Sequence, residues 1–166
     1  MRSEHRCWVY GDDVNTDVIF PGRYTYTLRE PDEIAAHALE DLDPAFARAV
    51  QPGDVIVAGA NWGCGSSREQ AVTALKHAGI ALIVAASFGR IYFRNCINQG
   101  LLPVTLPGLN TRLTTGDTLI WDRDAWTIRA AGESYAIPRL PVSVQAILDA
   151  GGLLPMLQQR FSQVMP

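Results

Sequence analysis

The fold is indicated first by the run Asp54-Val55-Ile56-Val57-Ala58-Gly59, a short apolar and β-branched segment bounded by turn residues. Such a run is typical of a strand that is buried on both faces of a parallel sheet. It is followed in order by a helical pattern, a second apolar run, a second helical pattern and a third apolar run, at residues 67–77, 80–86, 88–99 and 101–106. Gly79 and Gly100 mark the ends of the two helices. Alternating strands and helices predict a parallel sheet with right-handed crossovers.

The flanking segments add further elements but no second fold class. Before the central series we expect a short strand, a loop and a helix, at residues 8–10, 23–31 and 32–42. After it we expect three strands and two helices, at residues 118–121, 126–129, 134–137, 142–149 and 153–163. No linker, internal repeat or low-complexity segment divides the chain. The sequence therefore predicts one α/β domain over residues 1–166, with a mostly parallel sheet, flanking helices and a C-terminal antiparallel strand meander.

Composition and charge exclude several classes of function. The chain has 166 residues, of which 48% are hydrophobic and 19% charged, and this balance is typical of a folded core. A net charge of −3 with scattered basic residues gives no footprint for nucleic acid or for a membrane surface. No apolar run reaches the roughly 18 residues of a membrane span, and we expect no signal peptide. Cys7, Cys64 and Cys96 lie too far apart for a disulfide framework or metal motif, so we expect a cytoplasmic protein without its own metal.

The glycine-rich segment Gly63–Glu69 is the candidate site. Gly63 and Gly65 permit close approach of the backbone to a ligand, and amides at a helix start attract an anion. Arg68 adds a planar cation suited to a carboxylate. The segment lacks the third glycine of a dinucleotide motif and the Gly-Lys of a P-loop, so a nucleotide is less favoured. An alternative remains open: Ser66 and Glu69 have capping-box spacing, so Ser66 could be only a helix cap.

Four ordered motifs resemble the swivel domain of aconitase and the small subunits of the isopropylmalate dehydratases. They are Gly63-Cys64-Gly65-Ser66-Ser67-Arg68-Glu69-Gln70-Ala71, Gly11-Asp12-Asp13-Val14-Asn15-Thr16-Asp17-Val18-Ile19, Ser87-Phe88-Gly89-Arg90-Ile91-Tyr92-Phe93-Arg94-Asn95 and Gln99-Gly100-Leu101-Leu102-Pro103. The resemblance runs from about Gly11 to Leu106 and implies a single swivelling β/β/α domain of aconitase type.

The resemblance also implies a reaction and a partner. In this family a large partner subunit holds a [4Fe–4S] cluster, and the small subunit binds no cofactor of its own. Water is removed from a hydroxy acid and added back at the neighbouring carbon. Ser66 would be the catalytic base, Ser67 and Arg68 would bind the substrate, and Asp17 and Gly65 would support the site. For Asp17, a role in an Asx-turn is the alternative.

The loop of residues 23–31 is expected to select the substrate. Tyr26 and Leu28 suit an apolar pocket for an isopropyl group, whereas Arg23 or Arg29 suits an additional carboxylate. Either arginine could instead be a solvated surface charge. The expected reaction is the interconversion of 3-isopropylmalate and 2-isopropylmalate in leucine biosynthesis. Homoaconitate or another alkylmalate or citrate-like substrate is the alternative, and a non-catalytic carboxylate-binding module is the alternative from a different class.

Overall fold

A single seven-stranded sheet runs through the computed structural model, which describes residues 1–164. Its strands stand in the order β4-β3-β2-β1-β5-β6-β7. In chain order they are β1 (Arg2–Val9), β2 (Val55–Ala58), β3 (Leu82–Ala85), β4 (Leu102–Thr105), β5 (Thr118–Asp122), β6 (Thr127–Ala130) and β7 (Glu133–Ala136). Strands β1 to β4 pair in parallel, whereas β5, β6 and β7 are antiparallel to their neighbours. The expectation of a mostly parallel sheet is thus corrected to a mixed sheet with a parallel and an antiparallel half.

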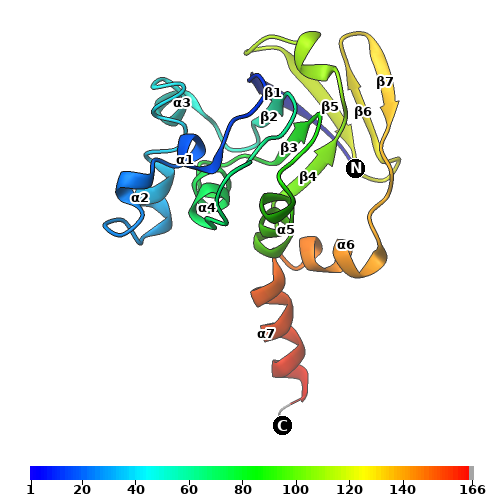
Figure 1. Cartoon of the computed structure of the whole chain (residues 1–166). Helices are drawn as coiled ribbons and strands as arrows, with labels where there is room; N and C mark the ends of the chain where they lie inside the picture. The colour runs from blue at the N-terminus through cyan, green and yellow to red at the C-terminus, as the bar shows by residue number, and fades with distance from the viewer. Residues whose placement is uncertain (165–166) are drawn as a thin grey trace.

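The helices are short, and most of them gather on one side of the parallel half (Figure 1). They are α1 (Thr16–Ile19), η1 (Gly22–Tyr24), α2 (Pro31–Ala35), α3 (Phe46–Ala49), α4 (Gln70–His77), α5 (Arg90–Gln99), η2 (Leu109–Thr111), α6 (Val142–Asp149) and α7 (Leu153–Val164). Helix α7 extends away from the rest of the molecule. Among the residues that the structure describes, no helix is long and apolar enough to cross a membrane.

Two apolar cores lie on opposite faces of the parallel strands. Because side chains alternate along a strand, Ile56 and Ala58 of β2 join the helices on one face, whereas Val55 and Val57 point to the other. On that second face the antiparallel strands supply Leu119, Trp121 and Ile128. The sheet therefore curls, so that its antiparallel half covers one face of its parallel half. Burial on both faces explains why β2 and β3 read as continuous apolar runs.

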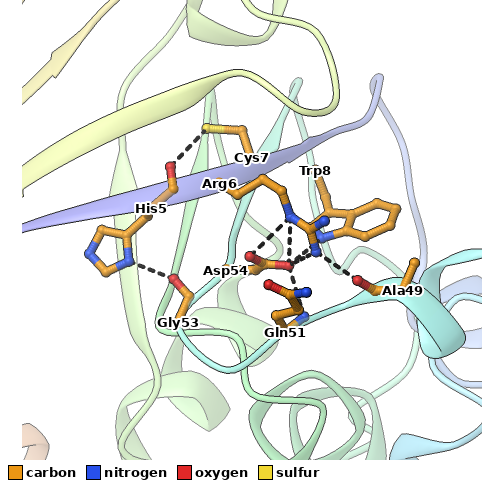
Figure 2. A network of polar contacts seen from close by, with 8 residues as sticks. All are labelled: His5, Arg6, Cys7, Trp8, Ala49, Gln51, Gly53 and Asp54. Atoms are coloured by element: carbon orange, nitrogen blue, oxygen red, sulfur yellow. Dashed lines mark hydrogen bonds and ion pairs between the residues drawn. The ribbon is translucent and has the colours of Figure 1, made fainter.

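A buried carboxylate joins the start of β2 to β1 (Figure 2). Asp54 accepts hydrogen bonds from Arg6 Nη2 at 2.5 Å, from Trp8 Nε1 at 2.9 Å and from the Gln51 amide at 2.9 Å. Its side chain is 6% exposed. Burial alone would raise the pKa of Asp54, but these donors together hold that pKa below its usual value. The network fixes the register of the two strands at the edge opposite the candidate site.

Most element boundaries agree with the sequence, and the differences have local causes. The helix expected at 32–42 ends at Ala35, because the chain then turns through Leu39 with a φ of +56°. The first strand begins at Arg2 rather than residue 8, since its polar first half pairs only with β5 on one side. Helix α4 begins at Gln70 rather than residue 67. The last shift matters for the candidate site.

Candidate functional site

The candidate site lies where two loops meet at the carboxyl ends of the parallel strands. The loop after β2 and the loop after β1 run side by side, with the Gly63 amide bonded to Val14 O at 2.8 Å and the Thr16 amide bonded to Cys64 O at 2.9 Å. Asp13 and Asn61 both have positive φ, and Asn61 Nδ2 donates to Asp13 Oδ1 at 2.9 Å. Aspartate and asparagine tolerate that conformation better than most residues. The glycine-rich segment is therefore held by the opening motif of the chain.

Ser66 is not a helix cap. Helix α4 starts four residues later, its N-cap is Glu69, and no side chain caps it. The capping-box alternative is therefore wrong, and Ser66 is an exposed residue in a loop. Its Oγ lies 3.0 Å from Thr16 Oγ1.

The backbone amides around Ser66 are available to an anion. Within residues 1–164, none of the amides of residues 65–69 donates a hydrogen bond to another protein group. Gly65 has a φ of +97°, a conformation that side chains rarely permit. The free amides that the sequence predicted at a helix start therefore lie in the loop that precedes the helix, and such runs of free amides suit anionic ligands.

The role expected for Gly63 is corrected. A Cβ on Gly63 would lie 2.1 Å from the Tyr92 ring, so this glycine lets the loop pack on the core rather than on a ligand.

Arg68 extends the same positive surface. It forms an ion pair with Asp17, and its Nη1 is buried without a hydrogen-bond acceptor at a favourable angle among the described residues. A Cβ on Gly22 would lie 2.6 Å from that nitrogen, so the glycine leaves the room that the guanidinium occupies. Asp17 thus orients Arg68 rather than forming an Asx-turn, whose place Asn15 takes by bonding the Val18 amide at 2.9 Å.

An open groove of about 690 Å³ runs along these residues. Its walls combine apolar side chains with two arginines, and it is lined by Thr25, Leu28, Arg29, Pro31, Ile34, Ser67, Arg68, Glu69, Gln70 and Thr73. The structure thus brings four predicted site residues together in one groove, namely Ser67, Arg68, Leu28 and Arg29. Apolar walls with a few charged groups suit a small carboxylate with an alkyl group.

Two predicted substrate contacts lie elsewhere. Arg23 forms ion pairs with Glu40 and Asp41, and its guanidinium stacks on Tyr24 at 4.7 Å. Tyr26 is 90% exposed and does not line the groove. The two acidic residues that pair with Arg23 come from the segment after α2. Nothing in the local pattern of the loop indicates that pairing.

Sequence reasoning also missed several residues of the site. These are Thr16 and Gly22, and on the groove walls Thr25, Ile34, Gln70 and Thr73. The sequence offered one signal for Thr16 and Gly22. Each directly precedes a predicted site residue, Asp17 or Arg23.

A second cavity, of about 290 Å³, lies between the sheet and α6. Arg123 and Asp149 at its rim form an ion pair with each other, and His5 hydrogen-bonds Ser3 and Gly53 O. These polar groups already have partners, so this cavity has fewer unpaired polar groups for a ligand than the groove has.

The cysteines of the chain do not fit a metal cluster. Cys7 and Cys96 are buried in the cores on opposite faces of the sheet, and Cys64 lies in the loop after β2. Burial raises the pKa of the Cys7 thiol to about 12, which disfavours the thiolate that binds a metal. The residues that the structure describes contain no group of three or more His, Cys, Asp or Glu side chains placed to hold a metal ion.

The geometry therefore defines an α/β protein with an exposed serine beside unpaired backbone amides and a groove that contains two arginines. Residues 21–109 match the family model described as the aconitase C-terminal domain. The small subunit 1 of 3-isopropylmalate dehydratase from Methanopyrus kandleri is 46% identical, over 93% of this chain and 91% of the relative. The isopropylmalate/citramalate isomerase small subunit of Methanocaldococcus jannaschii is 42% identical, over 98% and 99%.

A solved structure agrees with these relatives. The crystal structure of a 3-isopropylmalate dehydratase from Methanocaldococcus jannaschii superposes with a TM-score of 0.89 at 41% identity, over 96% of this chain and 95% of that one. The chain belongs to the aconitase C-terminal domain family, among relatives that are small subunits of 3-isopropylmalate dehydratases.

Proposed function

We propose that this chain is the small subunit of a hydro-lyase that interconverts 3-isopropylmalate and 2-isopropylmalate in leucine biosynthesis. The observation that carries the proposal is Ser66, exposed beside five free backbone amides and next to a groove that contains Arg68. The names of the relatives support the same reaction. The continuous sheet supports residues 1–166 as one domain, which we propose swivels over the site of a large partner subunit.

In the proposed reaction Ser66 acts as the base. Its deprotonated oxygen takes the proton from the carbon beside a carboxylate, and the C–H electron pair forms a double bond to the neighbouring carbon as the hydroxyl leaves with its bonding electron pair as hydroxide. The large subunit would supply the Lewis acid that assists this departure. Reversal with water at the other carbon gives the isomer. A serine oxygen needs nearby donors to lose its proton, and the neighbouring free amides and Arg68 support this proposed role.

The large partner subunit would supply the metal cluster. The thiols of this chain do not fit a metal cluster, so we propose that the [4Fe–4S] cluster belongs to the large subunit. The three cysteines are free thiols, which is consistent with the reducing cytoplasm as the proposed location.

The groove supports an alkyl-bearing substrate. Leu28, Pro31 and Ile34 can cover an isopropyl group, while Arg68 binds a carboxylate. Arg29 also lines the groove, and this observation favours a homoaconitate-like or citrate-like acid with one more carboxylate as the second candidate.

A substrate comparison with Leu28→Ala tests the assignment of the groove. We expect kcat/KM for 3-isopropylmalate to fall about tenfold, because an apolar wall contributes roughly that much discrimination. Citramalate, which is 2-isopropylmalate with a methyl in place of the isopropyl group, should be affected much less. The measurement is the initial rate of the complex with the large subunit on 3-isopropylmalate, citramalate and homoaconitate.

Leu42→Ala is the matched control, because Leu42 is partly exposed and lies outside the groove. Equal losses on 3-isopropylmalate and citramalate would remove Leu28 from the alkyl pocket. A preference of the wild-type complex for homoaconitate would select the second candidate.

Gly22→Ala tests the role of Arg68 without changing Arg68 itself. The new Cβ would crowd the guanidinium, so we expect KM for 3-isopropylmalate to rise about threefold to tenfold through a weakened charged hydrogen bond. The melting temperature should stay unchanged, because a flexible side-chain end can move aside. Gly11→Ala is the control, since a Cβ at Gly11 has no atom within 4 Å. Unchanged kinetics of Gly22→Ala would contradict the placement of Arg68 at the substrate.

A further inference from the structure

We propose that Thr16 is the positioning residue of Ser66, which it activates by donating a hydrogen bond to the deprotonated serine oxygen. This inference rests on the proposed function of Ser66 as the base.

The two hydroxyl groups are held together by the structure around them. Thr16 Oγ1 lies 3.0 Å from Ser66 Oγ, and Thr16 is 1% exposed. In the part of the chain that the structure describes, Ser66 is the only hydrogen-bond partner of the Thr16 hydroxyl. A buried hydroxyl normally has a partner, so this threonine is committed to Ser66.

The backbone of Thr16 fixes where its side chain points. Its amide donates to Cys64 O at 2.9 Å, and its carbonyl accepts from the Phe20 amide at 3.0 Å. The first bond ties Thr16 to the same loop that carries Ser66, and the second belongs to the short helix α1. The distance between the two hydroxyls is thus set by the backbone on both sides.

The charge on the serine oxygen decides the direction of the hydrogen bond. While Ser66 is neutral, either hydroxyl can donate. Once Ser66 has lost its proton, Thr16 is the only one of the two hydroxyls that can donate. A hydrogen bond to a charged oxygen is roughly twice as strong as a neutral one. The bond therefore stabilises the form of Ser66 that accepts a proton from the substrate. A donor that is already oriented also needs no reorganisation during the reaction.

If Thr16 only filled space, losing its methyl group would matter more than losing its hydroxyl. Valine has nearly the shape of threonine without its hydroxyl, so Thr16→Val would preserve packing and remove only the donor. Serine keeps the hydroxyl and loses a methyl group, so Thr16→Ser would do the reverse.

The test is steady-state kinetics of the complex with the large subunit on 3-isopropylmalate. We expect Thr16→Val to lower kcat about 10-fold to 100-fold, the range for a hydrogen bond to a charged group, with KM unchanged. Thr16→Ser should retain most of the activity, and Thr111→Val, which removes an exposed hydroxyl in η2, should behave as wild type. Combining Thr16→Val with Ser66→Ala should cost no more than Ser66→Ala alone, because the two residues act as one unit.

Normal kcat in Thr16→Val, or equal losses in Thr16→Val and Thr16→Ser, would overturn the inference. Ser66→Ala measured in parallel separates the two proposals. If Ser66→Ala is inactive while Thr16→Val is normal, only the role of Thr16 fails. If Ser66→Ala keeps its turnover, the proposed base fails and the role of Thr16 fails with it.

Discussion

Replacement of Ser66 by alanine is expected to lower kcat of the complex on 3-isopropylmalate by about 10²-fold to 10⁴-fold, the usual contribution of a positioned base. KM should change little, because the carboxylate contacts of Arg68 and the groove walls remain. Assembly with the large subunit should also persist, since the side chain removed is small, exposed and not a helix cap. The measurements are the steady-state rate and co-elution of the two subunits.

Ser134→Ala provides the control for Ser66→Ala. Ser134 is exposed on β7, in the antiparallel half of the sheet, and its replacement should leave the rate unchanged. Turnover of Ser66→Ala within a few-fold of wild type would remove Ser66 from the base role. The free amides around Ser66 would remain in that variant, because they belong to the backbone.

The second large effect is expected on stability. Asp54→Asn should lower the free energy of unfolding by about 3 kcal/mol, because a buried carboxylate loses the charge that strengthens its hydrogen bonds, while Arg6 is partly exposed and stays solvated. An amide at this position cannot accept from Arg6, Trp8 and the Gln51 amide as a carboxylate does. For a chain of this size the loss corresponds to a melting temperature lower by roughly 10 °C.

The pH dependence of this effect has a definite sign. The donors lower the pKa of Asp54 in the folded chain below its unfolded value of about 3.9. The contribution of the carboxylate is therefore fully present above pH 4, and is lost as pH falls through the folded pKa. The stability difference between wild type and Asp54→Asn should be constant near neutral pH and shrink below about pH 4.

Asp122→Asn is the matched control for Asp54→Asn. Asp122 also joins β1 to a neighbouring strand, but its partner Arg2 is 66% exposed, so the substitution should cost clearly less. Equal effects of the two substitutions, measured by chemical denaturation at several pH values, would contradict the special role of the Asp54 network.

The parallel half of the fold could be predicted from the sequence because its signals are local. The apolar runs of β2 and β3, and Gly79 and Gly100 after the helices, each follow from backbone preferences of a few residues. The curl of the sheet could not be predicted this way. It depends on β1 pairing in parallel with β2 and antiparallel with β5, a contact between residues more than a hundred positions apart.

In the candidate site, too, local signals could be predicted and long-range contacts could not. The glycine-rich segment and Arg68 were identified from their chemistry, but the capping pattern placed the start of α4 too early. Thr16 was missed because its importance lies in one long-range contact with Ser66. Arg23 was misassigned because its guanidinium forms ion pairs with Glu40 and Asp41. For Thr16 and Arg23 the missing information was a side-chain contact with another segment, which residue type and spacing do not contain.

The central claim is tested most directly by measuring the conversion of 3-isopropylmalate to 2-isopropylmalate by this chain, by the cluster-bearing large subunit and by the two combined. The proposed function predicts turnover only for the combined subunits, with an unsaturated acid as the intermediate. Turnover by this chain alone, or none from an assembled complex with 3-isopropylmalate, citramalate or homoaconitate, would contradict it.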